Sequence, residues 1–417
     1  MADRETLTGS LRNHSTVAPV QGGISAPAGF RTGAVHCGIK ADPLALDLAV
    51  LAADAPASAA ALFTTNLARA APVTVSQQHL GQTAGIARAV VVNSGCANAC
   101  TGELGLQHAR LMAQETATAL GCVPEQVLVA STGVIGVVLP IDRVTQGIRT
   151  ATGSMTGTGG GDAARAIMTT DPFPKEHAVS VQTPGGTFSV GGMSKGSGMI
   201  EPKMATMLGF LTTDARVAPG LLRRALQESA RDTFNAITVD GECSTNDSLF
   251  ALASGASGVV IDEVSYPALL QGLLAVSHEL ALGIVRGGEG ATKLIAVRVT
   301  DAASVDQARQ VARTIANSPL VKTAVHGADP NWGRIVAASG RSGVAFDPAR
   351  MTVRIGGILT FEHGLPNDDD AVQVVEHMKG HEVRIDVSLG SGGEASATIW
   401  TCDLSAEYVR INGEYRT

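Results

Sequence analysis

The sequence contains few aromatic residues and few cysteines. Only 3% of its 417 residues are Phe, Trp or Tyr, and its six cysteines are dispersed without a CxxC pair. Cys96 and Cys100 lie four residues apart, but no second ligand pair follows them at the spacing of a zinc site. We therefore expect no metal site and no disulfide framework, and we interpret the cysteines as small apolar residues in a reducing compartment.

The sequence also lacks a basic stripe, a long apolar run and the features of a signal peptide. Its formal net charge is -7, and no basic cluster alternates with aromatic residues, which argues against binding to DNA or RNA. No apolar run approaches the length of a membrane span. The first residues include Asp3, Arg4 and Glu5 rather than a basic start followed by an apolar core. These features predict a cytoplasmic protein with neither nucleic-acid nor membrane partners.

What the sequence does contain is small apolar residues in patterns typical of strands and helices. It is 45% hydrophobic and has 48 scattered glycines, and its length is enough for two or three domains. Short apolar runs predict strands at 89–93 and 127–130. Periodic apolar positions predict helices at 103–120 and 305–316, whereas residues 383–389 alternate as in a half-buried antiparallel strand. We expect an α/β protein with mixed or antiparallel sheets covered by helices.

The most informative segment is a glycine-rich approach to an Ala-Thr pair, SKGSGMIEPKMATMLGFL at 194–211. Glycines allow the backbone to turn sharply before the apolar run, which is expected to form a buried strand. The hydroxyl of Thr206 can attack the carbonyl of Ala205, and cleavage there gives Thr206 a free α-amine beside its own hydroxyl. Nucleophile and base then belong to one residue. Taken alone, however, an Ala-Thr pair is more often a turn that leads into a core strand.

Further motifs follow one another along the chain and decide between these interpretations. They are FTTN (63–66), NSGCANACTG (93–102), STGVIG (131–136), IMTTD (167–171), STNDS (244–248), GEGATK (288–293), NSPLVKTAVHGADPNWGRI (317–335) and the tail YVRINGEYRT (408–417). Together with KGSGMIEPKMATMLGFLTTDA around Thr206, this set resembles the ornithine acetyltransferase family, also called the bifunctional glutamate N-acetyltransferases. The resemblance extends from about Gly22 to Thr417, and the ordered set is far more specific than any single motif.

The resemblance implies a fold, a processing event and an assembly. The family has a layered αββα arrangement of the DmpA and ornithine acetyltransferase type, similar to the N-terminal nucleophile hydrolases. Cleavage between Ala205 and Thr206 gives an alpha chain of residues 1–205 and a beta chain of residues 206–417 that begins with the nucleophile. Two copies of each chain are expected to form a heterotetramer.

Acetyl transfer between two amines needs a nucleophile, a base and an oxyanion hole. Thr206 supplies the first two, since a free α-amine has an unperturbed pKa of about 7.7 to 8.0, close to the ideal for a general base near neutral pH. The resemblance assigns the oxyanion hole to Thr132 and Gly133, where a strand end presents a hydroxyl and a backbone N–H. After STGVIG the family usually has a charged or polar residue and then Pro-Leu-Pro, whereas this chain has VVLP at 137–140. The shape of that loop is therefore left open.

The resemblance also assigns the residues that contact the substrate: Thr170, Lys195, Thr206, Glu289, Asn412 and Thr417. Lys195 suits the substrate carboxylate, or else it keeps the Thr206 amine neutral by charge repulsion. Glu289 suits the distal ammonium of ornithine. Thr169 is an alternative to Thr170, because insertions blur the alignment there. Cys96 stands where the family commonly has Asn, and its role is left open.

The leading hypothesis is therefore a glutamate N-acetyltransferase of cyclic arginine biosynthesis. Acetyl moves from N2-acetylornithine to Thr206, ornithine leaves and glutamate accepts the acetyl group, with no cofactor or metal. Acetyl-CoA is a possible second donor, which these motifs do not decide. Two alternatives remain: an N-terminal-threonine amidase or aminopeptidase with water as acceptor, and a metabolite-binding or structural protein that cleaves itself once. The grouping of Lys195, Glu289 and Thr132 with one nucleophile argues against the last.

Overall fold

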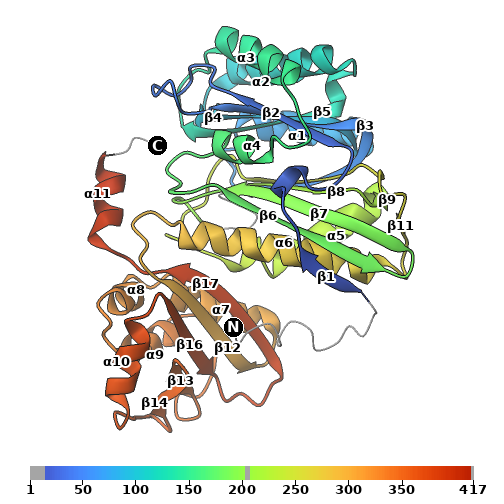
Figure 1. Cartoon of the computed structure of the whole chain (residues 1–417). Helices are drawn as coiled ribbons and strands as arrows, with labels where there is room; N and C mark the ends of the chain where they lie inside the picture. The colour runs from blue at the N-terminus through green and yellow to red at the C-terminus, as the bar shows by residue number, and fades with distance from the viewer. Residues whose placement is uncertain (1–14, 202–206, 415–417) are drawn as a thin grey trace.

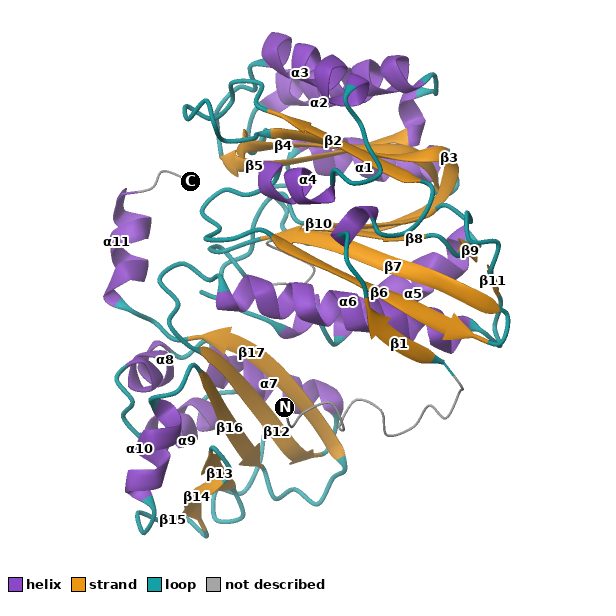
Figure 2. Cartoon of the chain, viewed as in Figure 1, coloured by secondary structure: helices purple, strands orange, loops and turns teal. Residues whose placement is uncertain are grey.

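The computed structural model describes residues 15–201 and 207–414. Ala205, Thr206 and Thr417, which carry three of the predicted roles, therefore lie outside the described residues. The described residues form a sheet of nine strands and a second sheet of six strands, and helices cover both (Figures 1 and 2).

The nine-stranded sheet mixes parallel and antiparallel neighbours, as the sequence predicts. Along the sheet its strands are β1 (Thr16–Pro19), β6 (Lys175–Thr183), β7 (Gly186–Lys195), β8 (Leu208–Thr213), β10 (Ser248–Ala253), β3 (Leu48–Phe63), β4 (Ile86–Cys96) and β5 (Val127–Val134), and β2 (Phe30–Val35) pairs with β3. The second sheet is β15 (Leu365–Pro366), β14 (Ile358–Glu362), β13 (Thr352–Ile355), β16 (Glu382–Ser388), β12 (Leu294–Ala302) and β17 (Ala395–Cys402). Strands β9 (Arg216–Val217) and β11 (Val260–Ile261) form a small separate pair.

The helices connect these strands and cover their outer faces. In chain order the α-helices are α1 (Ala71–Gln82), α2 (Gly102–Leu120), α3 (Ile141–Gly153), α4 (Gly160–Ala166), α5 (Pro219–Arg231), α6 (Tyr266–Arg286), α7 (Val305–Ala316), α8 (Pro319–His326), α9 (Trp332–Gly340), α10 (Ala371–Met378) and α11 (Ala406–Glu414). Short 3-10 turns lie at Gly23–Ser25, Pro124–Gln126 and Phe234–Ala236.

The alternation of side chains along the strands produces four layers. In β4, Val90 and Val92 point into a central core that also holds Phe210 of β8 and Phe250 of β10. The intervening Val91 points the other way, into the core beneath α1, α2 and α3. Phe210 and Phe250 are direct neighbours on the paired strands β8 and β10, and their rings stack with centroids 5.5 Å apart on the face that lines the central core. Helices, two layers of strands and helices thus follow one another, and the predicted layered αββα arrangement is confirmed.

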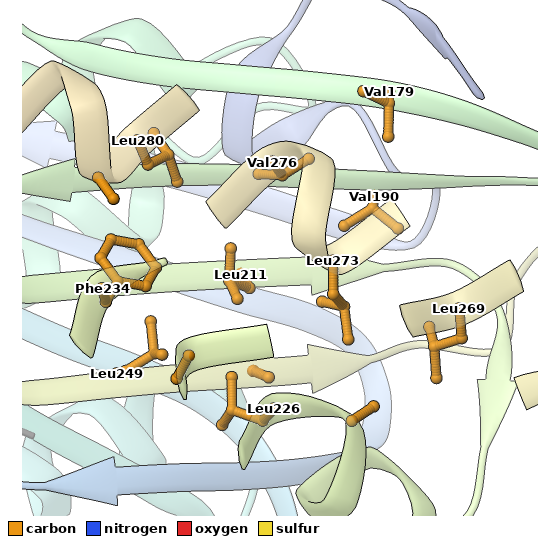
Figure 3. Packing of buried hydrophobic residues seen from close by; sticks show 14 of the residues in the cluster. Val179, Val190, Leu211, Leu226, Phe234, Leu249, Leu269, Leu273, Val276 and Leu280 are labelled. Atoms are coloured by element: carbon orange, nitrogen blue, oxygen red, sulfur yellow. The ribbon is translucent and has the colours of Figure 1, made fainter. Parts of the chain in front are cut away.

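Helix α6 is the core helix of the fourth layer. Its residues Leu273 and Val276 pack against Val190 of β7 and Leu211 of β8 (Figure 3). On its other side, His278 meets Trp400 of β17 edge to face at 5.1 Å, so α6 is covered by both sheets. A helix covered in this way is apolar around most of its surface. It is the one helix of the described residues that is long and apolar enough to cross a membrane, which corrects the expectation that no apolar run approaches that length.

The second sheet carries α7, α8, α9 and α10 around its own core and lies beside α6 (Figure 2). Val383, Ile385 and Val387 of β16 point into this core, as their alternation predicts. The expected half-buried antiparallel pairing is found between β16 and β13, but on its other side β16 pairs parallel with β12.

The predicted boundary between residues 205 and 206 does not separate two folding units. Lys195 at the end of β7 pairs with Leu208 at the start of β8 in one antiparallel ladder. The two predicted chains therefore share the nine-stranded sheet and the central core. Their separation by cleavage remains a prediction.

Candidate active site

A pocket lies at the carboxyl ends of β5 and β7 and at the amino ends of β8 and β10. Helix α11 extends along the outside of the same loops (Figure 1). The predicted oxyanion and substrate residues that the structure describes all line this pocket: Thr132, Gly133, Thr170, Lys195, Glu289 and Asn412. Met207, which follows the predicted nucleophile in the chain, also lines it.

Thr132 and Gly133 are placed by the parallel pairing of β5 with β4. The apolar run 127–130 of β5 is fully buried, so the strand is fixed before it reaches Thr132. Gly133 has φ +128, and a Cβ there would lie 2.3 Å from the carbonyl carbon of Gly95 and 2.6 Å from the nitrogen of Cys96. Both atoms belong to the backbone of β4, so only glycine fits at this position. The close contact fixes where the N–H of Gly133 lies relative to the hydroxyl of Thr132.

Lys195 is the last residue of β7, rather than part of the glycine turn, and its ammonium contacts the predicted oxyanion hole. Its Nζ donates a hydrogen bond of 3.0 Å to the hydroxyl oxygen of Thr132. Burial lowers the pKa of Lys195 below its usual value, and the carboxylates of Asp171, Asp247 and Glu289 partly oppose this effect. The sequence did not indicate that Lys195 and Thr132 touch, because 63 residues separate them.

A buried ion pair behind Lys195 was missed in the sequence. Asp171 Oδ1 accepts hydrogen bonds from Lys175 Nζ at 2.5 Å and from the backbone N–H of Gly196 at 2.7 Å, and Oδ2 accepts one from the N–H of Thr169 at 3.0 Å. Burial raises the pKa of Asp171, but the charges of Lys195 and Lys175 outweigh it and hold this pKa below its usual range. Asp171 belongs to the IMTTD motif, and that motif was the only indication in the sequence that this residue belongs to the site.

Glu289 also lines the pocket and is held by two side chains. The hydroxyl of Thr170 donates to Glu289 Oε1 at 2.7 Å, and Nδ2 of Asn412 donates to Oε2 at 2.8 Å. The backbone N–H of Glu289 donates to the carbonyl of Ser197 at 2.9 Å, which ties it to the glycine-rich segment. Thr169 also lines the pocket, but Thr170 is the threonine that contacts Glu289. Both oxygens of the carboxylate are thus held by neutral donors at the wall of the pocket.

Asp240 joins the glycine-rich segment to α11. Its carboxylate accepts the N–H of Met199 at 2.6 Å and the N–H of Ile200 at 2.8 Å, and the hydroxyl of Tyr408 donates to it at 3.2 Å. Met199 has φ +58, a conformation that is uncommon outside glycine and that these bonds hold in place. Neither Asp240 nor Tyr408 was predicted from the sequence.

Asp247 is a further buried carboxyl group of the pocket wall. It precedes β10, and Ser248 pairs with Leu208 of β8. Its Oδ2 has no hydrogen-bond partner among the described residues. Burial raises the pKa of Asp247 well above its usual value, which hydrogen bonds from Ser244 and Met207 and the charge of Lys195 only partly oppose. Asp247 lies in the STNDS motif, which identified the segment but not this side chain.

Metal ligation finds no support in residues 15–201 and 207–414. No group of three or more His, Cys, Asp or Glu side chains there is arranged to hold a metal ion. Cys96 is buried behind the oxyanion strand, and its thiol donates to the carbonyl of Val137 at 3.3 Å. Its backbone is also the part of β4 against which Gly133 packs. The polar groups that line the pocket are hydroxyl, amide, ammonium and carboxylate groups.

Comparison with known proteins gives matches over almost the whole chain. The model of the ArgJ family matches residues 31–417. A protein from Symbiobacterium thermophilum, named arginine biosynthesis bifunctional protein ArgJ, is 49% identical over 95% of this chain and 99% of its own length. A protein of the same name from Thermosynechococcus vestitus is 48% identical over 95% of this chain and 99% of its own length.

Solved structures are also similar to parts of the chain. The crystal structure of an arginine biosynthesis bifunctional protein from Bacillus halodurans is 41% identical, covers 50% of this chain and 100% of that chain, and has a TM-score of 0.49. The structure of an ornithine acetyltransferase from Mycobacterium tuberculosis, solved with ornithine, is 43% identical, covers 45% of this chain and 99% of that chain, and has a TM-score of 0.42.

Proposed function

Because the chain belongs to the ArgJ family, we propose that it is an acetyltransferase of arginine biosynthesis that moves an acetyl group from N2-acetylornithine to glutamate. The observation that carries this proposal is that one pocket brings together a hydroxyl and a backbone N–H, a lysine, and a glutamate held by two partners: Thr132, Gly133, Lys195 and Glu289. Such a pocket offers donors for a developing oxyanion and opposite charges for an amino-acid substrate.

The proposed nucleophile is Thr206, released by cleavage of its bond to Ala205. In the uncut chain the Thr206 hydroxyl attacks the Ala205 carbonyl, the C–N bond breaks, and water hydrolyses the resulting ester. The freed α-amine has an unperturbed pKa of about 7.7 to 8.0 and accepts the hydroxyl proton during acetyl transfer. The products are an alpha chain of residues 1–205 and a beta chain of residues 206–417.

Acetyl transfer then consists of two half-reactions, acetylation of Thr206 by acetylornithine and transfer of the acetyl group to glutamate. The Thr206 oxygen bonds to the acetyl carbon of acetylornithine, while its proton moves to the α-amine. The hydroxyl of Thr132 and the N–H of Gly133 stabilise the tetrahedral oxyanion by roughly 3 kcal/mol each. The C–N bond breaks as the proton passes to the departing ornithine nitrogen. The amine of glutamate then attacks the acetyl-threonine ester, and the same steps in reverse order release N-acetylglutamate.

Substrate selection is proposed to use two charged residues of the pocket, Glu289 and Lys195. Glu289 faces the distal ammonium of ornithine, and its two hydrogen-bond donors, Thr170 and Asn412, keep its carboxylate in place. Lys195 is the candidate partner of the substrate carboxylate. Thr417 is proposed as a further contact from the tail.

Three wider features belong to the same proposal. Acetyl-CoA serves as a second acetyl donor, in line with the word bifunctional in the names of the relatives. The cleaved chains assemble as a heterotetramer with two copies of each. The enzyme works in the cytoplasm, without a cofactor or a metal ion.

The proposal is tested by intact mass and by product analysis on the same preparations. The wild-type chain should separate into two fragments under denaturing conditions, and the Thr206→Ala chain should stay whole and inactive. Thr118→Ala, which removes an exposed helical threonine, should behave as wild type. Acetyl from acetylornithine should appear on glutamate. Release of free acetate instead would indicate an amidase, and an uncut chain with full transferase activity would contradict the role of Thr206.

A further inference from the structure

The contact between Lys195 and Thr132 shows which hydrogen-bonding role the Thr132 hydroxyl has in the predicted oxyanion hole. A threonine hydroxyl has one hydrogen to donate and two lone pairs, whereas a lysine ammonium can only donate. Because Lys195 Nζ donates to the Thr132 oxygen at 3.0 Å, that oxygen is the acceptor of this bond. The Thr132 hydrogen is then free to point elsewhere, and it is not donated to another described residue. The ammonium also polarises the O–H bond, which strengthens it as a donor.

We propose that Lys195 is a positioning residue of the oxyanion hole, which acts on the tetrahedral intermediate through the hydroxyl of Thr132. This inference rests on the proposed acetyl transfer and adds to it a role for Lys195 other than binding the substrate carboxylate. An oxyanion donor contributes most when it is already oriented before charge develops. Lys195 supplies that orientation, because its hydrogen bond occupies one lone pair of the Thr132 oxygen and so restricts rotation of the Thr132 hydroxyl.

The buried pair of Asp171 and Lys175 holds Lys195 in this position. Asp171 binds the backbone N–H of Gly196, the residue next to Lys195, at 2.7 Å. The other partner of the same oxygen, Lys175 Nζ, is itself buried and comes from β6, the strand beside β7. Backbone and charge thus fix the end of β7 from one side. On the other side, the pairing of β5 with β4 fixes Thr132, so neither partner needs to be ordered by the substrate.

Two readouts separate this role from carboxylate binding. A residue that binds the substrate carboxylate contributes to the affinity for ornithine, whereas a residue that acts through Thr132 contributes to kcat. A hydrogen bond from a charged group contributes about 1.5 to 3 kcal/mol, so Lys195→Met should lower kcat roughly tenfold to a hundredfold. Its affinity for ornithine, measured by calorimetry, reports separately how much Lys195 contributes to binding the substrate carboxylate. Lys379→Met, which removes an exposed lysine at the end of α10, is the control for loss of a positive charge.

A double-mutant cycle with Thr132→Ala gives the decisive result. If Lys195 acts through Thr132, Lys195→Met should cost less than about threefold in kcat when Thr132 is already alanine. Where a variant cleaves itself too slowly to give active enzyme, the rate of fragment formation by intact mass replaces kcat, and ornithine binding is measured on the uncut chain. Equal losses in both backgrounds, or a tenfold loss of ornithine affinity with kcat unchanged, would overturn the inference. A wild-type protein without acetyl transfer would instead overturn the proposed function.

Discussion

Replacing Gly133 with alanine is the sharpest local perturbation of the pocket that the backbone suggests. The new Cβ would lie 2.3 Å from the carbonyl carbon of Gly95 and 2.6 Å from the nitrogen of Cys96, and neither backbone atom can rotate away. The backbone conformation at this position, with φ +128, destabilises any residue with an L side chain by about 1 to 2 kcal/mol relative to glycine. Overpacking typically adds about 1 to 3 kcal/mol. Gly133→Ala should therefore destabilise the protein by about 2 to 5 kcal/mol.

The same substitution should displace the N–H of Gly133 from the oxyanion hole. Loss of one such donor lowers kcat roughly a hundredfold to a thousandfold. Gly136→Ala is the matched control, because Gly136 has φ +78 but no neighbouring atom within 4 Å of a new Cβ. Urea denaturation should show a larger loss of stability for Gly133→Ala than for Gly136→Ala. Initial rates of acetyl transfer should likewise show a larger loss of kcat for Gly133→Ala. Equal denaturation midpoints with equal kcat values would refute the argument that the contact with β4 positions this N–H.

Two further predictions concern buried charges. Lys175→Met leaves Asp171 without its nearest counter-ion and should lower the free energy of unfolding by about 3 to 5 kcal/mol, measured by urea denaturation; an unchanged midpoint would contradict this. Burial raises the pKa of Asp403, but hydrogen bonds from Thr292 and His326 bring it below its usual value. The resulting stability is present above the unfolded pKa and is lost as pH falls through the folded pKa, so Asp403→Asn should flatten the decline of the thermal midpoint under acid conditions. A decline as steep as in wild type would exclude Asp403 as its source.

The sequence predicted those elements that local patterns determine. The helix expected at 305–316 is α7 with the same bounds, and the buried strand expected after Thr206 is β8, whose six residues are all buried. In both cases the apolar spacing matches the period of one element. The layered arrangement came from the resemblance, because periodicity alone does not say which strands share a sheet.

Contacts between distant segments could not be predicted in this way. The crowding at Gly133 depends on the register of β4 against β5, and the bond from Lys195 to Thr132 depends on where two strands end. Asp171 was visible in a motif, but nothing in the sequence marked Lys175 as its buried partner. The apolar character of α6 has a similar cause, since both sheets cover that helix.

The central claim is that Thr206 carries the acetyl group, and the mass of the beta chain during turnover tests it most directly. The purified protein is mixed with N2-acetylornithine in the absence of glutamate, quenched in acid and analysed by intact mass. The account predicts a fragment that begins at Thr206 and carries one additional acetyl group, which disappears when glutamate is added before the quench. An active preparation whose chain is uncut, or whose acetyl group maps to another residue, would contradict the account.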